Sequence, residues 1–289
     1  MPEPPVVDAH QHFWDPAAAE YPWMTAALAA IRRRFGPEDL RPLLAQCGVD
    51  RTILVQARSS LDETREFLGI AARTEFVAGV VGWVDLTDSR VATALRELQA
   101  MPAGGRRLVG IRHQVHDEAD PDWLLRADVR RGLEAIQAAG LAYDLLVRPR
   151  ELPAALRTAS AFPEMRLVVD HMAKPPIRTG EIHAWAEAMG PFSELGNVYC
   201  KLSGMVTEAD WGAWRPEDLR PYVRRVVEWF GEDRLLFGSD WPVCLLAGSY
   251  AEVLGALLVA LGALSPGARA KILGTNAVHC YRLQIADVP

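Results

Sequence analysis

The stretch VVDAHQHFWD, from Val6 to Asp15, starts with an apolar run and continues into two histidines separated by one residue. It contains no glycine. A doubly wound open sheet that binds a nucleotide would need a glycine-rich loop directly after its first strand. The stretch therefore disfavours that fold and predicts a buried first strand whose far end carries polar side chains.

Seven further short apolar runs follow along the chain, and each is followed by a longer segment with helical spacing. Apolar runs without strict alternation are expected for strands covered on both faces of a parallel sheet. Eight strands alternating with helices, in units of about 30 residues, predict an α/β fold: a closed (β/α)8 TIM barrel, with residues 1–289 as a single domain. The expected strands are residues 6–12, 51–57, 76–84, 107–115, 141–147, 166–171, 198–204 and 234–240.

Two sequence signals predict where helices begin. The hexapeptide PEDLRP occurs at residues 37–42 and 216–221, and proline followed by two acids favours the first turn of a helix. The surroundings of the two copies differ, so they do not indicate an internal repeat. Ser249 with Glu252 three positions later predicts a capping box before the apolar run from Val253 to Leu264.

The composition narrows the class of protein. Half of the residues are hydrophobic, 24% are charged and the formal net charge is -6, as in a globular protein with a large core. Arginines are scattered among acids, so nucleic acid is not an expected partner. The first residues lack the pattern of a secretory signal. The apolar run 253–264 is shorter than the ~18 residues of a membrane span, so we expect no membrane partner.

That apolar run instead indicates a helix that is buried or faces another subunit, which allows a homo-oligomer. The four cysteines lie far apart without a metal-type spacing, and we interpret them as reduced thiols of a cytoplasmic protein. They are Cys47, Cys200, Cys244 and Cys280.

The ends of the predicted strands carry the candidate reactive residues, because the catalytic groups of (β/α)8 barrels lie there. His10 and His12 share one face of the first strand, about two rises of ~3.3 Å apart. Asp240 ends the eighth strand, which neighbours the first in a closed barrel. His171 ends the sixth. Each alone also has an ordinary structural interpretation, as a polar strand end, a cap or a turn residue.

Four stretches in this order resemble the amidohydrolase superfamily over nearly the whole chain, and more narrowly its branch of sugar-lactone hydrolases. They are VVDAHQHFWD, LVVDHMAKPP, CKLSG and LLFGSDWPVC. The resemblance implies a (β/α)8 barrel that hydrolyses an ester-like bond at its C-terminal mouth. It implies that His10, His12, His171 and Asp240 are catalytic.

The resemblance also bears on metal binding. Metal-binding members generally add a histidine from the fifth strand and sometimes a bridging lysine from the fourth, and neither is present here. A single divalent ion, zinc by its ligand chemistry, would be held by His10, His12 and Asp240, and completed by Asp144 or water. The resemblance equally allows a metal-free site, in which the histidines polarise the carbonyl.

The first hypothesis is the hydrolysis of an aldonolactone such as L-fucono- or L-rhamnonolactone. Asp240 would take a proton from water, while the histidines, with or without a metal, stabilise the oxyanion. Arg112 and His113 alternate along their strand, so only one of them is expected to face the pocket. The candidates to bind the sugar are Trp23, Gln56, Trp83, Arg112, His113 and Lys201, whereas Trp14 is expected to pack over the barrel rim.

Two alternatives stay open. One is a metal-dependent decarboxylase, or another amidohydrolase that acts on a small carboxylic acid. The missing histidine on the fifth strand argues against the decarboxylase, because such enzymes rely on their metal. The other is a barrel without catalytic activity that binds a carbohydrate acid or a protein partner.

Overall fold

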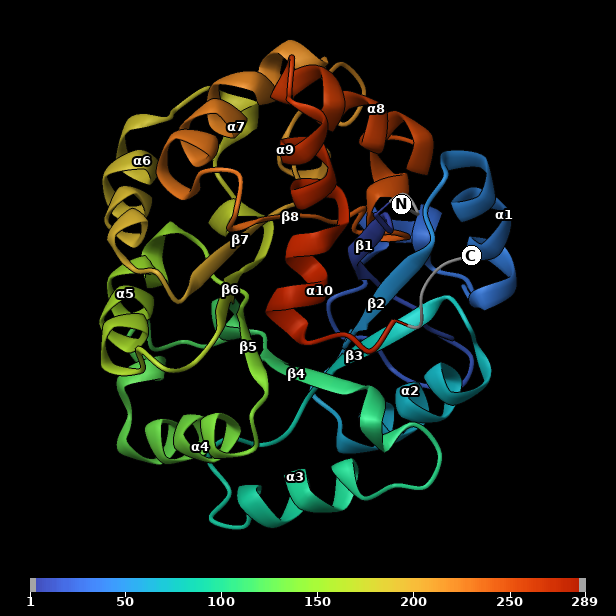
Figure 1. The fold of residues 1–289 in the computed structure, drawn as a ribbon, viewed down its shortest axis with the longest axis vertical. Coiled ribbons are helices and arrows are strands. Elements are labelled where there is room, and N and C mark those ends of the chain that lie inside the picture. The colour runs from blue at the N-terminus through green and yellow to red at the C-terminus, as the bar shows by residue number, and fades with distance from the viewer. Residues whose placement is uncertain (1–3, 286–289) are drawn as a thin grey trace.

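Eight parallel strands form the centre of the computed structural model, which describes residues 4–285. They follow one another around the sheet in chain order, and a parallel bridge from Gln11 to Trp241 joins the two ends. Helices surround the strands, as Figure 1 shows. The predicted (β/α)8 barrel is confirmed. The strands are β1 Val7–Gln11, β2 Arg51–Val55, β3 Val77–Gly82, β4 Leu108–His113, β5 Ala142–Leu145, β6 Leu167–Val169, β7 Val198–Leu202 and β8 Leu235–Phe237.

Every observed strand lies inside its predicted run and ends one to three residues before that run does. Some residues beyond the strand ends still bond to the neighbouring strand: the backbone N–H of Gln56 donates to Val81, and that of Asp240 donates to His10. The longer helices are α1 Pro37–Cys47, α2 Leu61–Arg73, α3 Val91–Gln99, α4 Ala127–Ala138, α5 Leu152–Ala161, α6 His183–Met189, α7 Pro216–Phe230 and α8 Tyr250–Leu261, followed by the short α9 Pro266–Ala270 and α10 Asn276–Tyr281.

The predicted helix starts are confirmed. Helices α1 and α7 begin at the first proline of each PEDLRP copy. Asp39 accepts a hydrogen bond from the backbone N–H of Gly36, and Asp218 does the same for Arg215. Helix α8 begins after Ser249 with the predicted capping box. These caps satisfy backbone donors that a helix start otherwise leaves unpaired.

Apolar side chains fill the N-terminal part of the barrel and the layer between strands and helices. Inside the barrel, small and branched residues of the strands pack against α10, which crosses the N-terminal opening that Figure 1 faces. Helix α8 buries one side, while Val259 is 46% exposed. No helix within residues 4–285 is long and apolar enough to cross a membrane. All four cysteines are free thiols.

Candidate active site

Strand β1 and the residue after it place two buried histidines, His10 and His12, at the C-terminal mouth of the barrel, because alternate residues share one face. His10 Nε2 and His12 Nε2 lie 3.2 Å apart. His12 Nδ1 lies 2.7 Å from the carbonyl oxygen of Val55, which can only accept a hydrogen bond. His12 therefore carries its proton on Nδ1, and the lone pair of Nε2 faces the site.

Asp240 follows β8 and meets the histidines where the barrel closes. Its Oδ1 lies 3.4 Å from His12 Nε2, 3.8 Å from His10 Nε2 and 3.9 Å from His171 Nε2. All four side chains are buried. The structure thus brings the four residues predicted to be catalytic together at the C-terminal end of the barrel.

Backbone strain accompanies two of these residues. His171 has φ of 53° and Asp240 has φ of 57°, in the left-handed region that residues other than glycine rarely adopt. Such conformations persist where the surrounding structure fixes them, and they cluster at functional sites. The two side chains therefore owe their positions to tertiary packing.

Two glycines make the close approach of these groups feasible. A Cβ on Gly238 would lie 2.8 Å from the Cβ of His10 and 3.1 Å from the Cβ of Ser203. A Cβ on Gly204 would lie 2.6 Å from Nδ1 of His171. Neither position accommodates a larger residue unless the site residues move.

Ser203 orients His171, because its Oγ lies 2.8 Å from His171 Nδ1. Burial lowers the pKa of His171 well below its usual range, although Asp240 raises it. The imidazole is therefore neutral at neutral pH. Burial raises the pKa of Asp240, but His171 opposes burial, and the pKa falls below its usual value, so the carboxylate is ionised.

A buried network of charges supports His10. Arg112 Nη1 lies 3.1 Å from His10 Nε2 and donates to Asp170 at 2.9 Å. Lys201 Nζ lies 3.2 Å from His10 Nδ1. The same ammonium pairs with Asp144 at 2.6 Å and with Asp170 at 3.0 Å. Both ring nitrogens of His10 thus have fixed neighbours.

The two acids of this network differ in pKa. Burial raises the pKa of Asp144 to about 6, against the opposing effect of Lys201. Burial also disfavours ionised Asp170, but Lys201 and His10 hold its pKa well below the usual range. The hydroxyl of Tyr281, on α10, donates to the two Asp144 oxygens at 2.8 and 2.9 Å. The network therefore links the far end of the barrel to the site.

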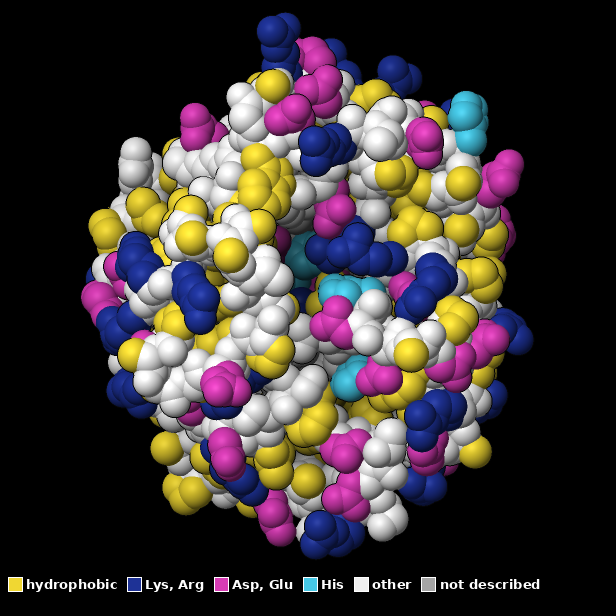
Figure 2. All heavy atoms as spheres, turned by 180° about the vertical axis from the view of Figure 1, so that it is seen from behind, with side chains coloured by type: hydrophobic (Ala, Val, Ile, Leu, Met, Phe, Trp, Pro, Cys, Tyr) yellow, Lys and Arg dark blue, Asp and Glu magenta, His cyan; other side chains and the backbone are white. Residues whose placement is uncertain are grey.

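A cavity of about 150 Å³ opens over Asp240, His12 and His171. Figure 2 shows this face hollowed near its centre, with histidine, basic and acidic side chains around the hollow. The other polar or aromatic side chains that line the cavity are Trp23, Arg112, Gln114, His116, Asp117 and Lys174. The cavity is smaller than the ~300–1,000 Å³ pockets that hold drug-sized ligands, so it favours a compact ligand.

The remaining predicted residues differ in their placement. Arg112 and Trp23 line the cavity, which answers which member of the Arg112 and His113 pair faces inward. His113 accepts a hydrogen bond from Trp83 Nε1 at 3.0 Å and stacks on Trp123, so His113 and Trp83 lie outside the cavity wall. The other two, Gln56 and Lys201, are buried behind the wall.

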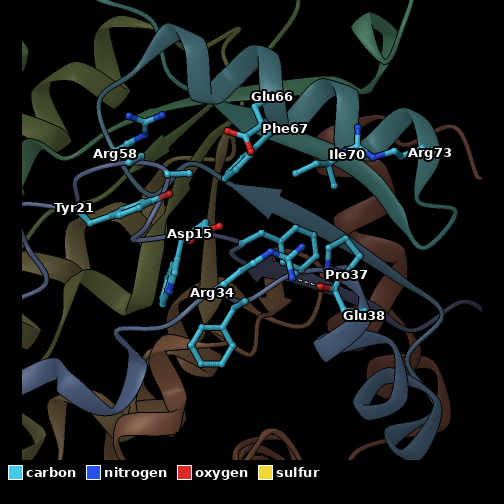
Figure 3. Close-up of a pocket in the computed structure, with 16 residues that line it drawn as sticks. Asp15, Tyr21, Arg34, Pro37, Glu38, Arg58, Glu66, Phe67, Ile70 and Arg73 are labelled. Atoms are coloured by element: carbon cyan, nitrogen blue, oxygen red, sulfur yellow. Dashed lines mark hydrogen bonds and ion pairs between the residues drawn. The ribbon is translucent and has the colours of Figure 1, made fainter.

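A second cavity, of about 270 Å³, lies between the connection from β1 to α1 and helix α2 (Figure 3). Arg34 and Glu38 at its rim pair with each other. None of the four candidate catalytic residues lines it. Trp14 forms part of its wall and donates Nε1–H to the carbonyl oxygen of Ile31, in agreement with the predicted packing role.

The sequence model of the family described as "Amidohydrolase" matches residues 7–283. The chain belongs to the amidohydrolase family. An L-fucono-1,5-lactonase of Burkholderia ambifaria is 45% identical over 96% of this chain and 95% of its own length. An L-fucono-1,5-lactonase of Burkholderia multivorans is 40% identical over 96% of both chains.

A crystal structure of an amidohydrolase from Burkholderia multivorans, with bound zinc, superimposes with a TM-score of 0.90 at 38% identity. The alignment covers 96% of this chain and 99% of that one. The similarity therefore includes the whole barrel and both of its ends.

Donor chemistry at the amidohydrolase site fits one metal ion. Within residues 4–285, His10, His12 and Asp240 offer ligand atoms that lie within 4.8 Å of one another. His12 suits this role because its Nδ1–H donates to a carbonyl, which is the support that metal-binding histidines usually have. Asp144 is not in this group and instead contacts Lys201 and Tyr281.

Three supporting residues received no role in the sequence prediction. Asp170 joins Arg112, Lys201 and His10. Ser203 orients His171. Asp8 accepts hydrogen bonds from Ser239, Tyr250 and the backbone of His10, and so fixes β1 against β8. Period-two alternation does not locate Asp8, because the register of β1 shifts between Asp8 and Gln11 and the Asp8 carboxylate meets Tyr250 of α8.

Proposed function

We propose that this amidohydrolase opens a sugar lactone to the sugar acid, with L-fucono-1,5-lactone or a closely similar aldonolactone as substrate. One observation carries the proposal. The ionised Asp240 lies within 3.9 Å of three imidazoles below a cavity of about 150 Å³. The lactonase names of the relatives at 45% and 40% identity agree with it.

Asp240 is the proposed general base. It would take a proton from a water molecule as that water attacks the lactone carbonyl carbon. When the ring C–O bond breaks, the protonated carboxyl would return the proton to the leaving ring oxygen. The ionised state of Asp240 at neutral pH suits this sequence of steps.

His171 is the proposed donor to the carbonyl oxygen. If the Ser203 hydroxyl donates to Nδ1, the Nε2 of neutral His171 bears hydrogen and faces the cavity. His12 differs, because its proton is on Nδ1, so its Nε2 would bind an ion instead of donating. The lone pairs of His12 and Asp240 provide a place for Zn²⁺, with His10 as third ligand. Such an ion, when bound, would polarise the carbonyl as a Lewis acid.

The sugar ring would be held by the cavity wall. Trp23 offers an aromatic face, and its Nε1–H is already used by the carbonyl of Ala57. Arg112, Gln114 and Lys174 offer donors for hydroxyl groups. We exclude Trp83 and His113 from this role, because they contact each other outside the wall.

A panel of aldonolactones, assayed by acid release with and without a chelator, tests the proposal. Asp240→Asn should lower kcat by about 10²–10⁴-fold, the usual range for loss of a general base, and leave the unfolding temperature unchanged or higher. Asp62→Asn, at an exposed position on α2, is the matched control and should keep full activity. Turnover by the Asp240→Asn protein at the wild-type rate would refute the assignment. Release of carbon dioxide from aromatic acids without lactonase activity would favour the decarboxylase alternative.

A further inference from the structure

A cavity of about 350 Å³ lies at the N-terminal end of the barrel, remote from the proposed active site. It is bounded by the end of α3, the start of β4, the turn from α4 to β5 and the segment after α10. Figure 1 faces this end, where the chain after α10 passes β4 and β3. The polar side chains that line the cavity are Gln99, Arg106, Arg107, Arg282 and Gln284.

The charge of this cavity is unbalanced. It is lined by three arginines, and no Asp or Glu of residues 4–285 contributes to its wall, in a chain whose formal net charge is -6. Some exposed arginines elsewhere pair with an acid one turn away, as Arg65 does with Asp62 and Arg225 with Glu228. In the described part of the chain, the side chains of Arg106, Arg107 and Arg282 form no ion pair within 4.0 Å. A concave wall that carries charges of one sign concentrates counter-ions, so this cavity should attract anions.

A fourth guanidinium strengthens the positive field. Arg166 donates to the carbonyl oxygens of Cys280 and Gly140, so it is anchored beside the cavity wall. Burial lowers the pKa of Arg166, and the charge of Arg282 lowers it further. Arg107 is likewise anchored, by a 3.2 Å hydrogen bond to the carbonyl oxygen of Ala78. Backbone carbonyls thus fix the guanidinium groups of Arg107 and Arg166, and each keeps N–H donors that the backbone does not use.

We propose that the cavity binds a small phosphate-type oxyanion, inorganic phosphate or a phosphate monoester, between Arg106, Arg107 and Arg282. Guanidinium groups match the paired oxygens of such an anion, and the amides of Gln99 and Gln284 add neutral donors. A neutral sugar lactone would leave the positive charges uncompensated, so the site is distinct in its ligand from the active site.

The anion would connect two parts of the fold that lie far apart in the sequence. Arg106 and Arg107 precede β4, whereas Arg282 follows α10, the helix that closes the barrel. A ligand that binds only the folded state raises stability in proportion to its concentration over its Kd. The expected consequence is resistance to unfolding at the N-terminal end of the barrel, with no change in lactone turnover.

Thermal unfolding of the full chain tests the proposal, with sodium phosphate compared with sodium chloride at matched ionic strength. The wild-type Tm should rise by about 2–4 °C at saturating phosphate. Arg106→Gln with Arg282→Gln should weaken phosphate binding, measured by calorimetry, by at least about tenfold. Arg225→Gln, the matched surface control, should keep the full response. Absence of a phosphate-specific rise, or an equal rise in the double variant, would overturn the proposal.

Two further arms complete the experiment. Arg106→Lys keeps the charge but loses the guanidinium fork, so it should bind phosphate with intermediate affinity even if the double variant does not fold. Calorimetry with a sugar phosphate distinguishes the sources of the ligand. Tighter binding of the sugar phosphate assigns the site to a monoester, tighter binding of phosphate assigns it to the free ion, and binding of neither overturns the proposal.

Discussion

Replacement of Lys201 by methionine tests whether this residue supports the site or holds substrate. The sequence suggested a contact with sugar hydroxyls, yet the side chain is fully buried and lies outside the cavity wall. Its ammonium contacts Asp144 at 2.6 Å, Asp170 at 3.0 Å and His10 Nδ1 at 3.2 Å. Methionine has a similar length but cannot compensate the two carboxylates.

Removal of one partner from a buried ion pair typically costs about 3–5 kcal/mol, because a buried charge loses its compensation. At roughly 2 °C per kcal/mol for a chain of this size, the Tm should fall by about 6–10 °C. The loss should be smaller at pH 5 than at pH 8, because burial already raises the pKa of Asp144 to about 6 and protonation removes the uncompensated charge.

Thermal unfolding at both pH values and lactone kinetics are the measurements. A support role predicts a lower kcat through misplaced His10, with KM changed less, because no sugar contact is lost. The double variant Lys201→Met with Asp144→Asn should recover part of the stability. A Tm within 2 °C of wild type, or a KM effect alone at full stability, would refute the interpretation.

Three further perturbations probe other parts of the fold and site. Burial raises the pKa of Glu63 from 4.5 to about 7. Between these two pH values the folded state binds more protons than the unfolded state, so the free energy of unfolding falls as the pH rises. Glu63→Gln should therefore raise the free energy of unfolding by up to about 3 kcal/mol at pH 8 and change it less at pH 4. Denaturant titrations at both pH values measure this, and an equal effect at the two would contradict the reasoning. Ser203→Ala leaves His171 Nδ1 without its hydroxyl partner and should lower kcat by about tenfold, while Ser203→Thr should recover part of the rate in the same steady-state assay. Gly238→Ala places a Cβ 2.8 Å from that of His10, so it should lower the free energy of unfolding by about 1–3 kcal/mol and reduce turnover. Stability and turnover both equal to wild type would show instead that the backbone after β8 adjusts without cost.

The fold was predictable because a barrel strand is buried on both sides. Runs such as residues 166–171 and 198–204 are continuous, and they locate β6 and β7 without any knowledge of the neighbours. The predicted runs extend too far because the backbone changes conformation at their ends, as at Asp240, whose φ is 57°. Ser203 and Asp240 contact His171 and His12, which lie far away in the sequence, so local sequence does not locate this change.

The candidate catalytic residues were predictable for a similar reason, since a barrel collects strand ends at one mouth. The supporting residues were less so. Asp170 directly precedes His171, but its partners Arg112 and Lys201 come from β4 and β7. Period-two alternation makes Arg112 and His113 alternatives, and only the structure shows that Arg112 lies inside.

The site includes many buried charges, although they lower the stability of the barrel. A barrel centre filled with apolar side chains would be more stable than one that holds Lys201 between two acids, because desolvation of ions is costly. The arrangement instead fixes both nitrogens of His10 and, through Tyr281, ties that histidine to the helix that closes the opposite end. The buried charges lower the stability of the barrel but fix the positions of the groups that meet the substrate. Fixed charges and dipoles can stabilise the transition state without having to reorient during the reaction. It follows that substitutions at Tyr281, although remote from the cavity, should alter turnover, and that those at the equally remote Arg106 should not.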